Sequence, residues 1–153
     1  MTAGQTPGHR TFRIAALAVL AVVGLARLGL SLSGMPDSIV RWVSMNVVGW
    51  TAALAWGVVA ARSAPGYRRL LPFAISQAVV FHSIAILGIL LTIAGWPNIY
   101  AAPEFSGPAA QSEWLHAASH LTLGMLAASL LWWGAACLSR LVTRKLAREA
   151  TPA

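Results

Sequence analysis

Residues 14–32 read IAALAVLAVVGLARLGLSL, an apolar run in which Arg27 is the one charged side chain. A helix that crosses a bilayer needs about 20 consecutive, mostly apolar residues, so this run predicts a transmembrane helix. Three further apolar runs follow, at about 39–61, 70–96 and 113–142. The four runs together predict an all-α integral membrane protein, folded as a four-helix up-down bundle.

The composition supports this class of protein. Hydrophobic residues make up 58% of the chain and charged residues 10%, whereas about 25% of the residues in a soluble domain are charged. Such a chain cannot cover a water-facing surface. A net charge of +7 would suggest nucleic acid as the partner of a soluble protein. Here the basic residues stand between or beyond the apolar runs, so we expect a lipid bilayer and no nucleic acid as the partner.

The distribution of basic residues predicts the orientation in the membrane. Basic residues gather in the N-terminal tail, residues 1–13, in the second connection, residues 62–69, and near the C-terminus, where residues 143–153 form a basic tail. The first connection holds one Arg with one Asp, and the third holds no base. Because cytoplasmic segments carry the excess of Lys and Arg, we expect both termini to be cytoplasmic. The membrane domain, residues 14–142, is then a multi-pass domain of a bacterial-type inner membrane.

A signal peptide is the alternative interpretation of the first run. Arg10 and Arg13 would form its positive region, residues 14–26 its apolar region, and residues 31–33 its cleavage site. The apolar character resumes after Arg27, which favours a retained helix. The orientation of the later runs is the same in both cases.

Small residues recur at four-residue spacing in the second run, at Gly49, Ala53 and Gly57. Such a stripe lets two helix backbones approach closely in lipid. We therefore expect this side of the second helix to pack against another helix.

The fourth run begins with a cluster of polar residues, Glu113, His116 and His120. At about 100° per residue, these three positions share one face of a helix. A carboxylate and two imidazoles at this spacing can ligate one transition-metal ion. In the structural alternative, Glu113 lies at the membrane interface and the histidines bond to backbone carbonyls or to Ser119.

His82 lies near the middle of the third run, where an unpaired ionisable side chain is costly. It is the candidate for a deep ligand, and with His120 it could hold a b-type haem. Upright helices would, however, place His82 about 20 Å and His120 about 10 Å below the outer surface. The structural alternative is a hydrogen bond from His82 to Asn46, Thr51 or Ser129.

A polar pocket near the outer face is the third expectation. Arg27 and Asn46 lie at a similar depth to the start of the fourth run, and Glu104 lies in the outer connection beside it. Together with Glu113 these residues could line a pocket, because contact between polar groups lowers their cost in lipid. Alternatively, the Arg27 side chain reaches up to the headgroups without any partner.

Several functions are excluded by missing residues. Cys137 is the only cysteine, so a two-cysteine thiol relay cannot form. A di-iron carboxylate bundle needs four acids on its helices, and no His-Glu-x-x-His, Gly-x-Ser-x-Gly or P-loop motif occurs. The residues therefore favour a non-enzymatic membrane subunit or binding protein, forming homo-oligomers or joining other membrane subunits. The alternative is a redox protein with a metal or haem held by His116, His120 and His82.

Overall fold

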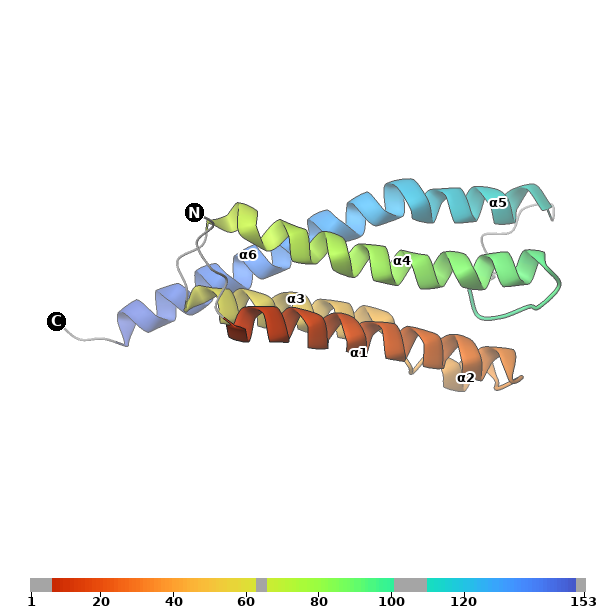
Figure 1. The fold of residues 1–153 in the computed structure, drawn as a ribbon, viewed down its shortest axis with the longest axis horizontal. Coiled ribbons are helices and arrows are strands. Elements are labelled where there is room, and N and C mark those ends of the chain that lie inside the picture. Colours follow the sequence, from red (N-terminus) through yellow and green to blue (C-terminus); the bar gives the residue numbers. More distant parts are fainter. Residues whose placement is uncertain (1–6, 63–65, 101–109, 151–153) are drawn as a thin grey trace.

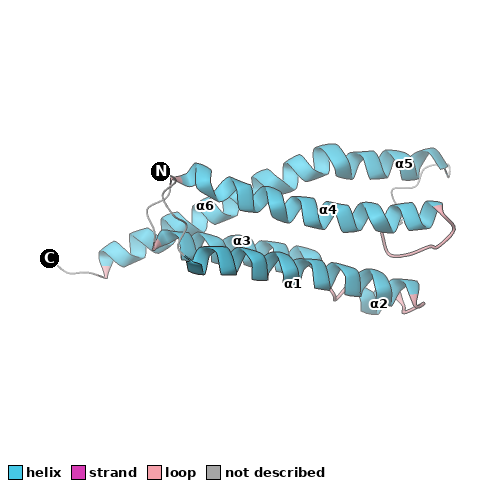
Figure 2. Cartoon of the chain, in the orientation of Figure 1, coloured by secondary structure: helices cyan, strands magenta, loops and turns pink. Residues whose placement is uncertain are grey.

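The computed structural model describes residues 7–62, 66–100 and 110–150, and this part of the chain is helical without any β-strand (Figure 2). Its elements are α1 (Pro7–Leu32), α2 (Asp37–Val40), α3 (Met45–Ala61), η1 (Tyr67–Leu70), α4 (Leu71–Ile93), α5 (Ala110–Ser119), η3 (His120–Gly124) and α6 (Met125–Glu149). Four helical stretches are long and apolar enough to cross a membrane, namely Gly8–Leu32, Asp37–Ala61, Tyr67–Ile93 and Glu113–Glu149. The predicted all-α class and the four apolar helices are confirmed.

Several helix ends differ from the predicted bounds. Helix α1 begins at Pro7, inside the segment expected to be a tail, and α6 continues to Glu149, so that it projects beyond the other helices (Figure 1). The second run is not one continuous helix, because residues 41–44 separate α2 from α3. There the Ser44 hydroxyl accepts a hydrogen bond from the Val47 amide, which satisfies one of the free N–H groups of the first turn of α3.

The closest helix contact in the bundle is the seam between α3 and α6. A Cβ atom built on Gly57 would overlap the Ala136 carbonyl oxygen and lie 2.9 Å from the Arg140 amide nitrogen. The Ser139 hydroxyl adds a hydrogen bond of 2.8 Å to the Leu54 carbonyl. The predicted close approach of two backbones is thus found at Gly57, whereas Gly49 of the same stripe lies against the Trp132 ring.

Helix α1 packs against α3 and α4, and α6 also packs against these two helices. Helices α3 and α4 follow each other in the chain but lie mostly across the bundle from one another. Stacked rings of Phe12 and Trp56 join α1 to α3 at 5.7 Å, and Phe73 of α4 lies against both rings. Farther along, Gly24 of α1 lies directly against Met45 and Ile84. These contacts leave the outward faces of all four long helices covered with exposed Leu, Val and Trp side chains.

Substitution Gly57→Ala is expected to lower the free energy of unfolding by about 1–3 kcal/mol, because the added methyl forces two backbones apart. Gly134→Ala is the matched control, since a Cβ there meets no atom within 4 Å, and we expect it to be neutral or to raise stability by up to about 1 kcal/mol. Denaturation followed by circular dichroism in mild detergent measures both. Equal stability of the two variants would contradict the close backbone contact between α3 and α6 at Gly57.

Candidate functional site

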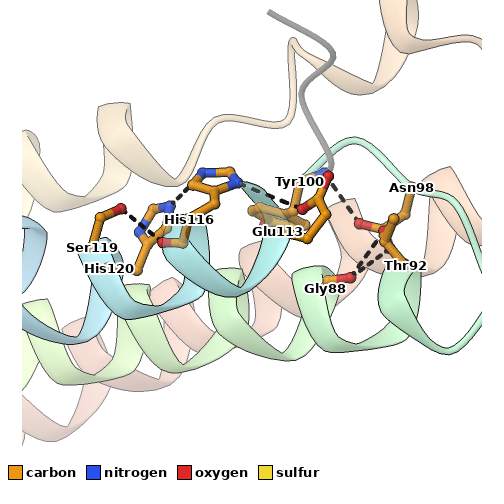
Figure 3. Close-up of polar contacts among 8 residues, drawn as sticks. All are labelled: Gly88, Thr92, Asn98, Tyr100, Glu113, His116, Ser119 and His120. Atoms are coloured by element: carbon orange, nitrogen blue, oxygen red, sulfur yellow. Dashed lines mark hydrogen bonds and ion pairs between the residues drawn. The ribbon is translucent and has the colours of Figure 1, made fainter. Parts of the chain in front are cut away.

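Four side chains form a connected series that we call the histidine row: Glu113, His116, His120 and His82. The His82 and His120 Nδ1 atoms lie 2.7 Å apart, and the His120 and His116 Nε2 atoms lie 3.2 Å apart. A Glu113 carboxylate oxygen lies 3.8 Å from His116 Nδ1. Figure 3 shows the first three side chains following one another along α5 and into η3. The predicted shared face of Glu113, His116 and His120 is therefore found, and α4 adds His82 to it.

The helix that carries the row is not a regular α-helix at this point. The segment η3, His120–Gly124, is a π-helical turn, which adds one residue to a turn and re-aims the side chains around it. A Cβ on Gly124 would lie 2.9 Å from His82 Cε1, so the missing side chain at this position admits the imidazole. The π turn has no signal in the sequence, and Gly124 alone did not predict it.

The expected difference in depth between His82 and His120 is not found. Helix α4 ends at Ile93 and α5 begins at Ala110, so both helix ends differ from the predicted bounds of 96 and 113. At about 1.5 Å per residue, His82 lies about 16 Å from its helix end and His120 about 15 Å from its helix start. The two imidazoles therefore lie level with each other and can touch.

The row faces the interior of the bundle. His82 is 5% exposed, and the side chains of Glu113 and His116 are 15% and 18% exposed. In the adjoining segment η3, the apolar side chains of Leu121 and Leu123 are exposed. The polar side chains of the row are thus covered by protein while neighbouring apolar side chains are not.

The other residues predicted for the pocket are not gathered around the row. Asn46 is exposed in the first turn of α3, and Glu104 lies outside the described residues. The Arg27 guanidinium lies over the Tyr100 ring, 5.4 Å from its centroid. Within the described ranges Arg27 forms no ion pair with Glu113. His82 forms its hydrogen bond with His120, and the Ser129 hydroxyl donates a hydrogen bond to the Met125 carbonyl.

A second cluster of polar groups near the row was not predicted from the sequence. The Asn98 amide donates to the Gly88 carbonyl at 2.7 Å, and its oxygen accepts from the Tyr100 amide at 3.1 Å (Figure 3). The Ile99 amide donates to the Ser31 hydroxyl at 2.8 Å. The chain beyond α4 is therefore tied back onto α1 and α4. Burial raises the pKa of the Tyr100 phenol, and the nearby Arg27 charge partly opposes this shift.

The geometry decides which chemistry each histidine pair can support. Two nitrogens that bind one tetrahedral metal ion at about 2.0–2.1 Å lie about 3.3 Å apart. The 3.2 Å between His116 and His120 Nε2 matches this spacing, whereas the 2.7 Å between His82 and His120 Nδ1 is too short for an intervening ion and is a hydrogen bond. It is also too short for a haem iron between these atoms.

The Nδ1 atoms of His116 and His120 each face a further side chain. Nδ1 of His116 faces Glu113 and Nδ1 of His120 faces His82, while the two Nε2 atoms face each other. Carboxylate and hydrogen-bond partners of this kind commonly orient histidine ligands. Within the described part of the chain, no group of three or more His, Cys, Asp or Glu side chains could hold a metal ion. The chain therefore presents two nitrogen ligands.

Comparison with family models, with curated proteins and with solved structures gives no match to this chain.

The hydrogen bond between His82 and His120 should be visible by nuclear magnetic resonance. In protein labelled with ¹⁵N-histidine, we expect a nitrogen–nitrogen coupling across the bond between these two Nδ1 atoms. His9, which lies edge-on to Trp56, serves as the internal control without such a coupling. Gly124→Leu should abolish it, because the larger side chain displaces the His82 ring. Well-resolved signals of both rings without coupling in the wild type would refute the geometry.

Proposed function

We propose that the protein is a multi-pass protein of a bacterial-type inner membrane, an up-down bundle with both termini in the cytoplasm. The basic segments support this orientation, because they alternate with segments poor in Lys and Arg. The contacts agree with alternating helix directions. His9 near the start of α1 lies against Trp56 near the end of α3, whereas Gly24 lies against Met45 at the start of α3.

Thiol labelling in intact cells tests this orientation. In a Cys137→Ser background, Ser63→Cys lies in the connection between α3 and α4, and Ser106→Cys in the connection between α4 and α5. We expect a membrane-impermeant reagent to label Ser106→Cys in intact cells and Ser63→Cys after lysis only. Labelling of both positions from the same side would contradict the proposed topology.

We further propose that the protein is a non-enzymatic membrane subunit whose ligand is a divalent transition-metal ion of the Zn²⁺, Cu²⁺ or Ni²⁺ type. The observation that carries this proposal is the pair of Nε2 atoms of His116 and His120, 3.2 Å apart on the covered face of α5 and η3. Imidazole nitrogen suits these ions. Glu113 and His82 supply the partners that orient the two imidazoles.

Two protein ligands leave coordination positions for water or for groups from a partner. Structural zinc sites have four protein ligands and catalytic ones three, so two ligands from one chain support an exchangeable ion or a site completed in an assembly. A homo-oligomer or a neighbouring membrane subunit could supply the remaining ligands. This role is that of a binding subunit, in keeping with the few acids and the absence of a catalytic motif in the sequence.

Zinc titration of the purified protein in mild detergent tests the proposal. The wild type is expected to bind one Zn²⁺ per chain, measured by calorimetry, and His116→Ala and His120→Ala to lose this binding. Glu113→Gln should weaken it by about 10–100-fold, the usual effect of losing a partner of a histidine ligand.

The matched control is His9→Ala, because His9 lies on α1 away from the row. It should bind zinc as the wild type does. Retention of stoichiometric zinc in both His116→Ala and His120→Ala would exclude the site, and so would loss of zinc in His9→Ala alone.

A further inference from the structure

Arg140, at the opposite end of the bundle from the histidine row, is a buried cation. It is 2% exposed. Its guanidinium lies over the Tyr67 ring at 4.8 Å from the centroid. Its Nε and Nη1 atoms are buried without a hydrogen-bond partner. The Trp133 indole donates to the Tyr67 carbonyl at 3.0 Å, which holds η1, and with it the ring, against α6.

The charge of this guanidinium has no counter-charge in the described part of the chain. Arginine stays protonated in proteins, and a buried charge without a partner is costly. Asp37 and Glu113 lie in the first turns of α2 and α5, at the far end of the molecule from the second half of α6 (Figure 1). Glu149 lies 3.9 Å from Lys145. An anion from outside the chain would satisfy the free donors of Arg140.

Further basic residues continue from Arg140 along α6. Arg144 and Arg148 follow at intervals of four residues, which places them near Arg140 on the helix surface. Both line a shallow hollow beside Ala61, at the end of α3. Arg144 and Arg148 thus border a hollow where α3 ends and α6 continues past the bundle, and the buried Arg140 precedes them by four and eight residues on α6.

The neighbouring surface is suited to acyl chains. Leu138, Leu141 and Val142 are exposed on α6 on either side of Arg140. The region therefore combines cationic donors with an apolar flank at the end of a membrane-spanning helix, where lipid headgroups lie. Basic pockets between transmembrane helices on the cytoplasmic side bind anionic headgroups, and arginine forms paired hydrogen bonds with phosphate.

We infer that Arg140, together with Arg144 and Arg148, binds the phosphate of an anionic phospholipid at the inner end of the seam between α3 and α6. The bound headgroup supplies the charge that the chain lacks and ties η1 and α6 to the bilayer surface. This inference rests on the proposed membrane orientation but is independent of the metal site.

Thermal unfolding of the full chain in mild detergent tests it, with added phosphatidylglycerol, phosphatidylcholine or inorganic phosphate. We expect phosphatidylglycerol to raise the Tm and the other two additives to leave it unchanged. Native mass spectrometry should show one retained phosphatidylglycerol per chain. An equal rise with phosphatidylcholine would overturn the anionic preference, and an equal rise with inorganic phosphate would show a free anion in place of a lipid.

Arg140→Gln should lose both the Tm rise and the retained lipid. Arg41→Gln is the matched control, because Arg41 is exposed beyond α2 at the other end of the bundle, and it should respond as the wild type does. If Arg140→Gln fails to fold, the double variant Arg144→Gln and Arg148→Gln decides, since it removes the outer guanidinium groups and leaves the buried one. An undiminished lipid response in the variant that folds would overturn the inference.

Discussion

The contact on which the bundle depends is the approach of two helix backbones at Gly57 and Ala136. Lipid tails are as apolar as leucine, so burying leucine against another helix gains little in a membrane, and close packing has to hold the helices together. Gly57 of α3 meets the backbone of α6 directly. Because α6 also contacts α4, and α1 contacts both α3 and α4, this seam aligns the remaining pairs. The buried Arg140 lies on α6, and three members of the histidine row lie on α5 and η3, which lead directly into α6.

The polar side chains of the histidine row contact one another inside the bundle. The histidine row begins at Glu113 in the first turn of α5 and ends at His82 in the middle of α4. The π turn after Ser119 and the space above Gly124 make this possible, since they bring the His120 and His82 rings into contact. A local departure from the regular helix at a cluster of ionisable residues is typical of functional sites. The row is therefore the part of the protein best suited to hold a ligand.

The two ends of the molecule have different chemistry. At one end Asn98, Tyr100 and Ser31 tie the chain beyond α4 to α1 with neutral hydrogen bonds. At the other end the polar groups are cations, of which Arg140 is buried against an aromatic ring. The neutral hydrogen-bonded cluster needs no further group, whereas a buried cation is stabilised by an anion.

The sequence by itself determined the class of the protein, the four apolar helices, the small-residue side of α3 and the shared face of Glu113, His116 and His120. These features depend on composition and on a period of 3.6 residues, which are local properties of the chain. Tertiary structure alone decided that α3 packs on α6, that His82 lies level with His120, that Asn46 is exposed and that Arg140 is buried. Periodicity tells which face of a helix is special, but neither which helix covers that face nor how far the two helices are shifted along their axes. That shift depends on where each helix ends. The predicted ends of α4 and α5 were each wrong by three residues, and this was enough to place the His82 and His120 imidazoles at different depths in the prediction, although they are hydrogen-bonded in the structure.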